Sequence, residues 1–215
     1  MSQLFSPPFG LMVKLAALAV LGALAGGIWV WRTATAMPQG LGEPVAQPVQ
    51  FSHKHHVGDD GIDCRYCHGG VEQAAFAGIP PLSTCMGCHA RLFTDQPALR
   101  PLLEAWERRA PLAWNRVNQL PDFVYFNHGV HVAKGVGCAD CHGDVARMPR
   151  TARVRPLSMD WCLDCHRAPQ RHLRPPERIF DAAWSAPDQE ALGRRLLAFY
   201  RIDRARLLDC SLCHR

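Results

Sequence analysis

All ten cysteines of this 215-residue chain follow one pattern, in which two cysteines flank two other residues and a histidine comes directly after. The five copies are Cys64-Arg65-Tyr66-Cys67-His68, Cys85-Met86-Gly87-Cys88-His89, Cys138-Ala139-Asp140-Cys141-His142, Cys162-Leu163-Asp164-Cys165-His166 and Cys210-Ser211-Leu212-Cys213-His214. This spacing is typical of c-type haem attachment, in which both thiols bind the haem covalently and the histidine becomes the proximal iron ligand. The pattern therefore predicts five covalently bound haem c groups.

Two other uses of paired cysteines fit the pattern less well. A tetrahedral zinc site needs four ligands, and an odd number of Cys₂His units does not combine into such sets. A disulfide framework would not require a histidine after every pair. We therefore expect the thiols to bind haem and the five histidines to bind iron as proximal ligands, these being His68, His89, His142, His166 and His214.

The chain contains an internal duplication that supplies further histidines. A Phe-x-His-x-x-His segment begins at Phe51 and again at Phe126, and each copy is followed by two of the cysteine motifs. We therefore predict two related two-haem modules, residues 51–89 and 126–166, with a fifth haem at residues 210–214. Histidines three apart lie on similar sides of a helical turn, so each can reach a different iron if the turn lies between two haems. The predicted distal ligands are His53, His56, His128 and His131.

The repeated histidines supply only four distal ligands, and the fifth is left open. His172 is one candidate, and Met148 and Met159 are others because thioether ligation raises the potential of a haem iron. His55 is left over from the first repeated segment, and we expect it at the surface.

The length and composition bound the fold. A chain of 215 residues is too short to build an ordinary apolar core around five large cofactors, so the haems themselves should form the core. The 17 glycines and 17 prolines favour loops over long regular elements. We expect a multihaem cytochrome c of loops and short α-helices wrapped around five haems, with negligible β-structure and one N-terminal transmembrane helix.

Two helices outside the motifs are indicated by capping residues. Thr94 or Asp95 could begin a helix that runs to Arg109 with an apolar face at helical spacing. Ser185 followed by Asp188 resembles a capping box for a second helix.

The formal net charge of +5 would by itself suggest an anionic partner. The carboxylates of five haems more than offset this charge, so it gives no support to nucleic-acid binding. Nearly all the basic residues are arginines, whose planar guanidinium groups pair with carboxylates in a two-pronged geometry. The run of Arg147, Arg150, Arg153 and Arg155 is therefore expected to be a solvated or propionate-bound strip, with a docking patch for an acidic partner as the alternative.

An apolar stretch near the N-terminus, Leu15 to Trp31, contains no charged residue. With the residues before it, the stretch reaches the length of about 20 that crosses a bilayer as a helix. Haem is attached outside the cytoplasm in bacteria, so we expect a single-pass helix in the cytoplasmic (inner) membrane and a haem domain on its periplasmic, outer face.

The predicted organisation is therefore an anchor at residues 1–36, a Pro- and Gly-rich spacer at 37–50 and a pentahaem domain at 51–215. The alternative for the first segment is a signal peptide cleaved after Ala36, because Ala34-Thr35-Ala36 fits the small-residue pattern. The apolar run is longer than a usual signal core, which favours the retained anchor.

Several longer motifs make the sequence similar to a known family. They are Phe51-Ser52-His53-Lys54, Gly61-Ile62-Asp63 before the first cysteine motif, Trp114-x-Arg116-Val117, Leu120-Pro121-Asp122-Phe123-Val124-Tyr125-Phe126-Asn127-His128, and Trp161 to Arg167 around the fourth. Together they resemble the pentahaem cytochrome c subunit of bacterial alternative complex III. Members of that family often have histidine at the position of Asn118. If it is a ligand in them, the fifth distal ligand differs here.

The resemblance implies a respiratory complex that oxidises quinol, in which this subunit docks on an iron–sulfur subunit. Electrons would pass on to a soluble cytochrome or a terminal oxidase. The subunit itself would have no catalytic residues. Two alternatives are a stand-alone anchored or periplasmic multihaem carrier or quinol dehydrogenase, and a multihaem reductase. A reductase needs an open iron position, which plentiful spare ligands argue against.

Overall fold

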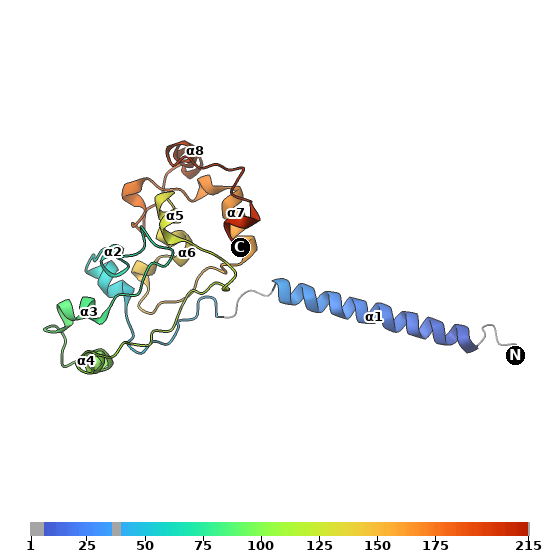
Figure 1. The fold of residues 1–215 in the computed structure, drawn as a ribbon, viewed down its shortest axis with the longest axis horizontal. Coiled ribbons are helices and arrows are strands. Elements are labelled where there is room, and N and C mark those ends of the chain that lie inside the picture. The colour runs from blue at the N-terminus through green and yellow to red at the C-terminus, as the bar shows by residue number, and fades with distance from the viewer. Residues whose placement is uncertain (1–6, 36–39, 215) are drawn as a thin grey trace. The chain divides into compact units, whose positions relative to one another are not determined.

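The computed structural model describes residues 7–35 and 40–214 (Figure 1). Its contacts divide the chain into two units, residues 1–39 and 40–215, which are considered separately. The first unit contains one helix, α1 (Pro7–Thr35). Its segment Pro8–Arg32 has a mean hydropathy of 2.1 and no buried residue, so by length and composition it could cross a membrane. A signal sequence would meet the same criterion, and the predicted cleavage residue Ala36 lies outside the described residues.

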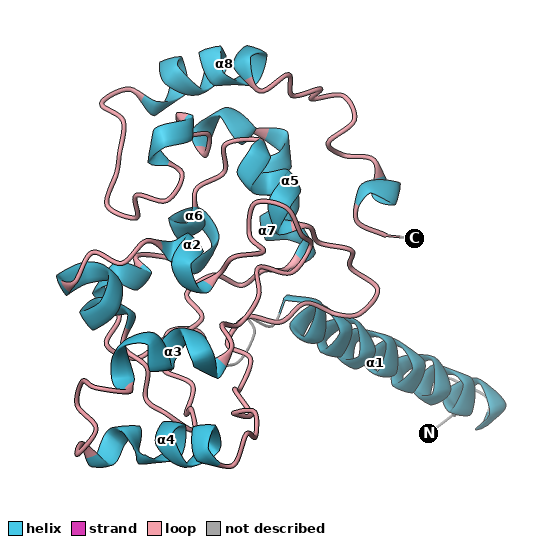
Figure 2. Cartoon of the chain, turned by 60° about the vertical axis from the view of Figure 1, so that its left-hand side comes forward, coloured by secondary structure: helices cyan, strands magenta, loops and turns pink. Residues whose placement is uncertain are grey.

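The second unit consists of short helices joined by loops (Figure 2). Its α-helices are α2 (Cys64–Cys67), α3 (Leu82–His89), α4 (Arg100–Glu107), α5 (His128–Ala133), α6 (Cys138–His142), α7 (Met159–Arg167) and α8 (Gln189–Phe199). The other helical segments are the π-helix η1 (Lys54–Asp59) and the 3₁₀ helices η2 (Pro97–Leu99), η3 (Val145–Arg147), η4 (Pro169–Arg171), η5 (Pro176–Arg178) and η6 (Cys210–Leu212). Within residues 40–214 no strand forms, and pairing is limited to isolated bridges at Pro44–Ala152 and Val136–Leu173. The expectation of negligible β-structure is confirmed.

The two helices predicted from capping residues form, but both begin later than expected. The helix predicted from Thr94 or Asp95 starts only at Arg100, after the 3₁₀ turn η2. Pro97 and Pro101 lack a backbone N–H, so they fit the first turns of these two elements and set where they start. The helix predicted from Ser185 is α8, whose N-cap is Asp188, since its side chain accepts a hydrogen bond from the Ala191 N–H.

Apolar packing by the polypeptide alone is sparse. Only ten apolar side chains are buried among the described residues. One cluster joins α3 to α4, which lie side by side in both ribbon views, through Met86, Leu102 and Val49. A second cluster contains Val71, Val132 and Ile179. Such small clusters fit a fold whose interior is completed by cofactors.

The two repeated segments dock on each other's modules in a reciprocal way. The Lys54 N–H donates to the Met148 carbonyl at 3.0 Å, and the Gly129 N–H donates to the Ala74 carbonyl at 3.0 Å. These contacts are equivalent, because residues 54 and 129 occupy matching positions of the duplicated segment. A side chain at Gly129 would meet the Glu72 carbonyl at 3.0 Å, so glycine permits this close approach.

Candidate haem-binding site

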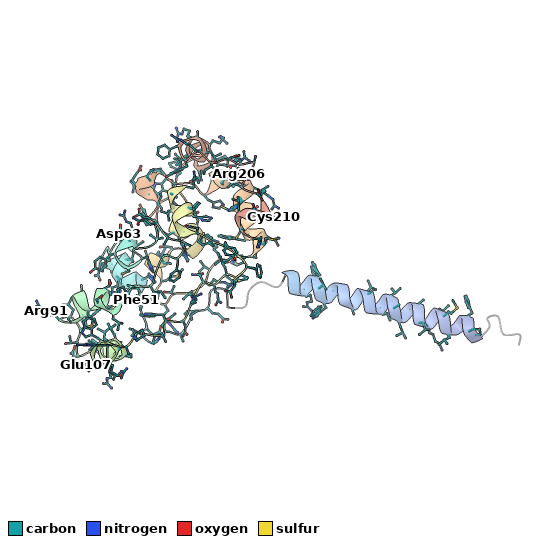
Figure 3. All side chains as sticks on the ribbon, in the orientation of Figure 1. Phe51, Asp63, Arg91, Glu107, Arg206 and Cys210 are labelled. Carbon is teal, nitrogen blue, oxygen red and sulfur yellow. The ribbon has the colours of Figure 1, made fainter. Side chains whose placement is uncertain are left out.

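Each of the five cysteine motifs lies on a helical turn, in α2, at the end of α3, in α6, in α7 and in η6. A helical turn brings residues three and four apart onto one face, which places both thiols and the histidine of a motif on the same side. Aspartates cap two of these turns: Asp63 accepts from the Arg65 N–H and Asp209 from the Ser211 N–H. Figure 3 labels Asp63 beside the first motif and Cys210 in the last.

The structure places each predicted distal histidine of the repeat opposite one motif histidine. The ring centroids lie 6.5 Å apart for His53–His68, 6.1 Å for His56–His89, 6.3 Å for His128–His142 and 6.3 Å for His131–His166. The two histidines of each repeated segment therefore face different motifs.

This separation fits a metal ion between the rings. A metal–imidazole bond is about 2 Å long, as known for zinc. Two such bonds and the radii of two imidazole rings place the ring centroids about 6 Å apart, close to all four observed separations. The cysteines of a motif lie beside one ring of each pair, so the residues present fit a bis-histidine c-type haem.

The Nδ1 atoms of these histidines are already engaged. Within residues 40–214, seven donate to backbone carbonyls, in the pairs His56–Ser52, His68–Gly78, His89–Leu92, His128–Ala75, His131–Asn127, His166–Leu207 and His214–Phe123, at 2.8 to 3.2 Å. Two others contact side chains, at 2.9 Å from His53 to Thr151 Oγ1 and at 3.0 Å from His142 to the Asn118 amide. A hydrogen bond at Nδ1 fixes the tautomer and leaves Nε2 as the metal-binding atom.

Burial keeps several of these imidazoles neutral. It lowers the pKa of His53 to about 4, with smaller contributions from the neighbouring His68, His56 and His142. Burial likewise lowers the pKa of His142 to about 4 and, to a smaller extent, that of His131. A neutral imidazole is the form that binds a metal ion, so these side chains need not lose a proton at neutral pH.

The ten thiols, none in a disulfide, lie in a series of neighbouring motifs. A hydrogen bond between the thiols of Cys64 and Cys138 raises the pKa of Cys138, so the first and third motifs meet there. Burial raises the pKa of Cys67, and the charge of the nearby Cys85 thiolate raises it further. The second motif therefore lies next to the first.

The other half of the series continues from the third motif. Burial raises the pKa of Cys141 to about 12, and the fourth-motif thiols of Cys165 and Cys162 add to it. Burial also raises the pKa of Cys162, with the nearby Cys213 of the fifth motif as the next cause. The order of neighbours is therefore second, first, third, fourth and fifth motif.

The repeated phenylalanines hold the histidines of their own segment. Phe51 stacks on His56 at 4.4 Å and meets His53 edge-on at 4.9 Å. Phe126 does the same, at 4.5 Å from His131 and 4.8 Å from His128. The geometry explains why phenylalanine accompanies the two histidines in both copies.

The remaining predicted residues are placed as follows. His55 is half-exposed and lies 3.6 Å from Asp60 through its Nε2. The Nδ1 atom of His172 lies 3.3 Å from Asp140, inside the third motif. The Met148 methyl group approaches Gly143, next to His142. Met159 is 63% exposed, one helical turn before Cys162. Among the described residues, the ring that contacts His214 is that of Phe123, whose centroid lies 5.9 Å away.

The arginine run contains one buried polar atom. The Arg153 Nε has no hydrogen-bond partner among the described residues. Its guanidinium donates to the Pro156 carbonyl at 3.3 Å, whereas Arg147, Arg150 and Arg155 are exposed. A buried donor without a partner suits a carboxylate supplied by the cofactor.

Sequence patterns alone did not indicate the side chains that contact the ligands from outside the motifs. Thr151 lies 98 residues from His53, and the sequence shows no periodic signal that links them. The nearly buried Arg174 pairs with Asp140 at 3.3 Å within the third motif. Each depends on long-range docking, which only the structure shows.

Residues 124–215 match the family model of cytochrome c7 and related cytochromes c. The match begins just before the second Phe-x-His-x-x-His segment and includes the last three cysteine motifs. The chain has the fold of a multihaem cytochrome c. The expected fold class is confirmed, and covalently bound c-type haem is the cofactor of this family.

The chain is also similar to the multihaem cytochrome c subunit of a menaquinone reductase from Nitratidesulfovibrio vulgaris (strain Hildenborough). The two chains are 35% identical over 121 residues, which cover 56% of this chain and 54% of the relative. The chain thus spans about half the length of that relative.

Proposed function

We propose that this multihaem cytochrome is a membrane-anchored electron-relay subunit with five haem c groups, acting in a quinol-oxidising complex of the alternative complex III kind. When bound, each haem supplies an iron that accepts and releases one electron. The unbroken series of neighbouring motifs is the observation that carries this proposal. It offers a continuous order of attachment sites from the second motif to the fifth.

The paired histidines support electron transfer over catalysis. His53, His56, His128 and His131 would hold the distal positions opposite four motif histidines. An iron with both axial positions filled has no open site for a substrate, which argues against a reductase. The chain's own part is to fix the imidazoles through their Nδ1 hydrogen bonds and to exclude water from between the rings.

For the fifth iron, bound by His214, we propose Met159 as the distal ligand. Its helix also carries Cys162, whose thiol lies near Cys213 of the fifth motif. Met159 is exposed and so is free to approach a group placed there. His172 is less well placed because it bonds Asp140 in the third motif, and Met148 lies beside Gly143 of the same motif.

The relative in N. vulgaris supports a membrane quinone complex with other subunits as partners. We propose an iron–sulfur subunit as the electron donor and a soluble cytochrome or terminal oxidase as the acceptor. Because that relative belongs to a menaquinone reductase, electron delivery towards quinone is the second candidate.

The complex can be tested by solubilising native membranes in mild detergent and staining a native gel for haem. A large band that contains an iron–sulfur protein and multi-span subunits supports the proposal. A small band with this chain alone would reject it in favour of a stand-alone carrier. The direction of electron transfer can be tested by adding menadiol to the isolated complex. Rapid reduction of the haems supports quinol oxidation, and haems that stay oxidised reject it.

We propose that residues 1–36 are retained as the anchor, residues 37–50 form the spacer and residues 51–215 form the pentahaem domain. The exposed apolar surface of α1 motivates this assignment. The cytochrome should stay in the membrane pellet after alkaline carbonate washing, with an intact mass that includes the N-terminal helix. A mature chain that begins at Met37 would contradict the anchor.

The angles between paired rings predict distinct electron paramagnetic resonance signals. The rings are nearly parallel in His53–His68 (11°) and His128–His142 (6°), intermediate in His131–His166 (32°) and strongly crossed in His56–His89 (66°). Crossed axial imidazoles give a low-spin ferric signal of unusually large anisotropy. We expect one such signal in the oxidised protein, and its loss in His56→Ala. Persistence of this signal in His56→Ala would contradict the pairing.

A further inference from the structure

His142 differs from most of the predicted ligands in what contacts its Nδ1 atom. The contact is the side-chain amide of Asn118, at 3.0 Å, rather than a backbone carbonyl. The amide nitrogen Nδ2 faces the ring in the structure, and the amide oxygen Oδ1 is buried with no hydrogen-bond partner among the described residues. The Asn118 Oδ1 is thus a buried acceptor without a donor in the described part of the chain, although its side chain contacts the ring of His142.

The tautomer of His142 accounts for this unpartnered amide oxygen. Iron binding through Nε2 requires that Nδ1 carry the proton, so Nδ1 must donate a hydrogen bond. The oxygen and nitrogen of an asparagine amide are assigned from their hydrogen bonds. Rotating the Asn118 amide by half a turn places Oδ1 against the Nδ1–H and gives both groups a partner.

We propose that Asn118 is a positioning residue for the third haem: its Oδ1 accepts the His142 Nδ1–H, holds the ring nearly parallel to that of His128 and sets the reduction potential of the iron. The inference rests on the proposed haem ligation. It concerns the reduction potential of the third haem iron, which the identity of the axial ligands alone does not determine. An acceptor at Nδ1 adds negative character to the imidazole and so stabilises the ferric iron.

The loop that carries Asn118 is held in place upstream. The Asn115 side chain donates to the Ala46 carbonyl at 2.7 Å, and Gln47 bonds the Asn115 backbone at both its N–H and its carbonyl. This pinning fixes the loop three residues before Asn118. A fixed acceptor can impose an orientation on a ligand, whereas a mobile one cannot.

Asn118 also has no equivalent in the first module. There the side chain that contacts a ligand is Thr151, at the distal His53, while the proximal His68 donates to a backbone carbonyl. At Asn118 the acceptor for a proximal histidine is therefore a side chain, which a substitution can change, rather than a backbone carbonyl. The third motif is the middle of the series, where a change in potential affects transfer between both halves.

Two variants of opposite expected sign test the inference on the purified full-length protein. Asn118→Asp keeps the shape and offers a charged acceptor, so one of the components in a spectroscopic redox titration should move to lower potential. Asn118→Leu removes the acceptor, so one component should move to higher potential and one low-spin signal should change anisotropy as the ring is released. Gln119→Glu makes the same amide-to-carboxylate change at the exposed neighbouring residue and should leave every component in place.

Haem content separates this inference from the proposed function. Five haems in the parent protein, with opposite shifts in the two Asn118 variants, support it. Equal shifts, or no shift, in variants that keep five haems overturn the role of Asn118 alone. A parent protein without a low-spin haem at the third motif overturns the ligation on which the inference rests. Loss of haem from Asn118→Leu with an unshifted Asn118→Asp would indicate a structural role only and also overturn it.

Discussion

Replacing both Cys138 and Cys141 by alanine should divide the electron relay into two halves that no longer exchange electrons rapidly. The third motif lies between the first and fourth motifs, so its loss leaves a gap in the series. Electron tunnelling slows steeply with distance, and the gap is as wide as a haem. When a quinol or a small donor reduces the variant, about half of the remaining haem should react fast and the rest orders of magnitude more slowly, as measured by stopped-flow absorbance.

The control removes a haem from the end of the series instead. Replacing Cys210 and Cys213 by alanine lowers the haem content equally but leaves the remaining motifs contiguous. Its remaining haem should be reduced in one phase. A single fast phase in the Cys138/Cys141 variant, with four haems confirmed by intact mass, would contradict the order of motifs. The rapidly reduced half also identifies the end at which electrons enter.

Substitution of His53 by alanine should open one iron without releasing its haem. In the proposed ligation, thioether bonds to Cys64 and Cys67 and the proximal His68 would keep the cofactor attached, while the iron would lose its ligand opposite His68. We expect one low-spin haem to become high-spin, to bind carbon monoxide and to rise in potential. The measurements are the ferric spectrum, carbon monoxide difference spectra and a redox titration.

His55 provides a matched control two residues away. It is half-exposed, and its ring lies near Asp60 rather than a motif histidine. His55→Ala should therefore retain the parent spectrum and bind no carbon monoxide. If His53→Ala stayed fully low-spin, or if both variants bound carbon monoxide alike, the assignment of His53 as an axial ligand would be wrong.

The spacing of neighbouring residues was enough to predict those parts of the site that lie within a single helical turn. The cysteine motifs are such parts, and so is the use of His53 and His56 for different motifs. The pairing of particular histidines was harder, because His53 and His68 are separated by a loop whose course depends on docking. Thr151 and Asn118 could not be found from spacing, since each reaches its histidine across the fold.

The helix boundaries show a second limit of the sequence. Thr94, Asp95 and Ser185 have good capping side chains, but capping preference is weaker than the backbone restriction of a nearby proline. Pro97 favours a 3₁₀ turn and delays α4 to Arg100. The ligand opposite His214 is not one of the repeated histidines, so no second copy constrains it.

The reciprocal docking of the two repeated segments bears on how the protein is assembled. His53 contacts Thr151, and the Lys54 N–H donates to the Met148 carbonyl, so the first module cannot complete its contacts until residues 148–151 are in place. The second module depends in turn on Ala74 and Ala75 of the first. The duplicated unit is therefore a unit of sequence but not of folding.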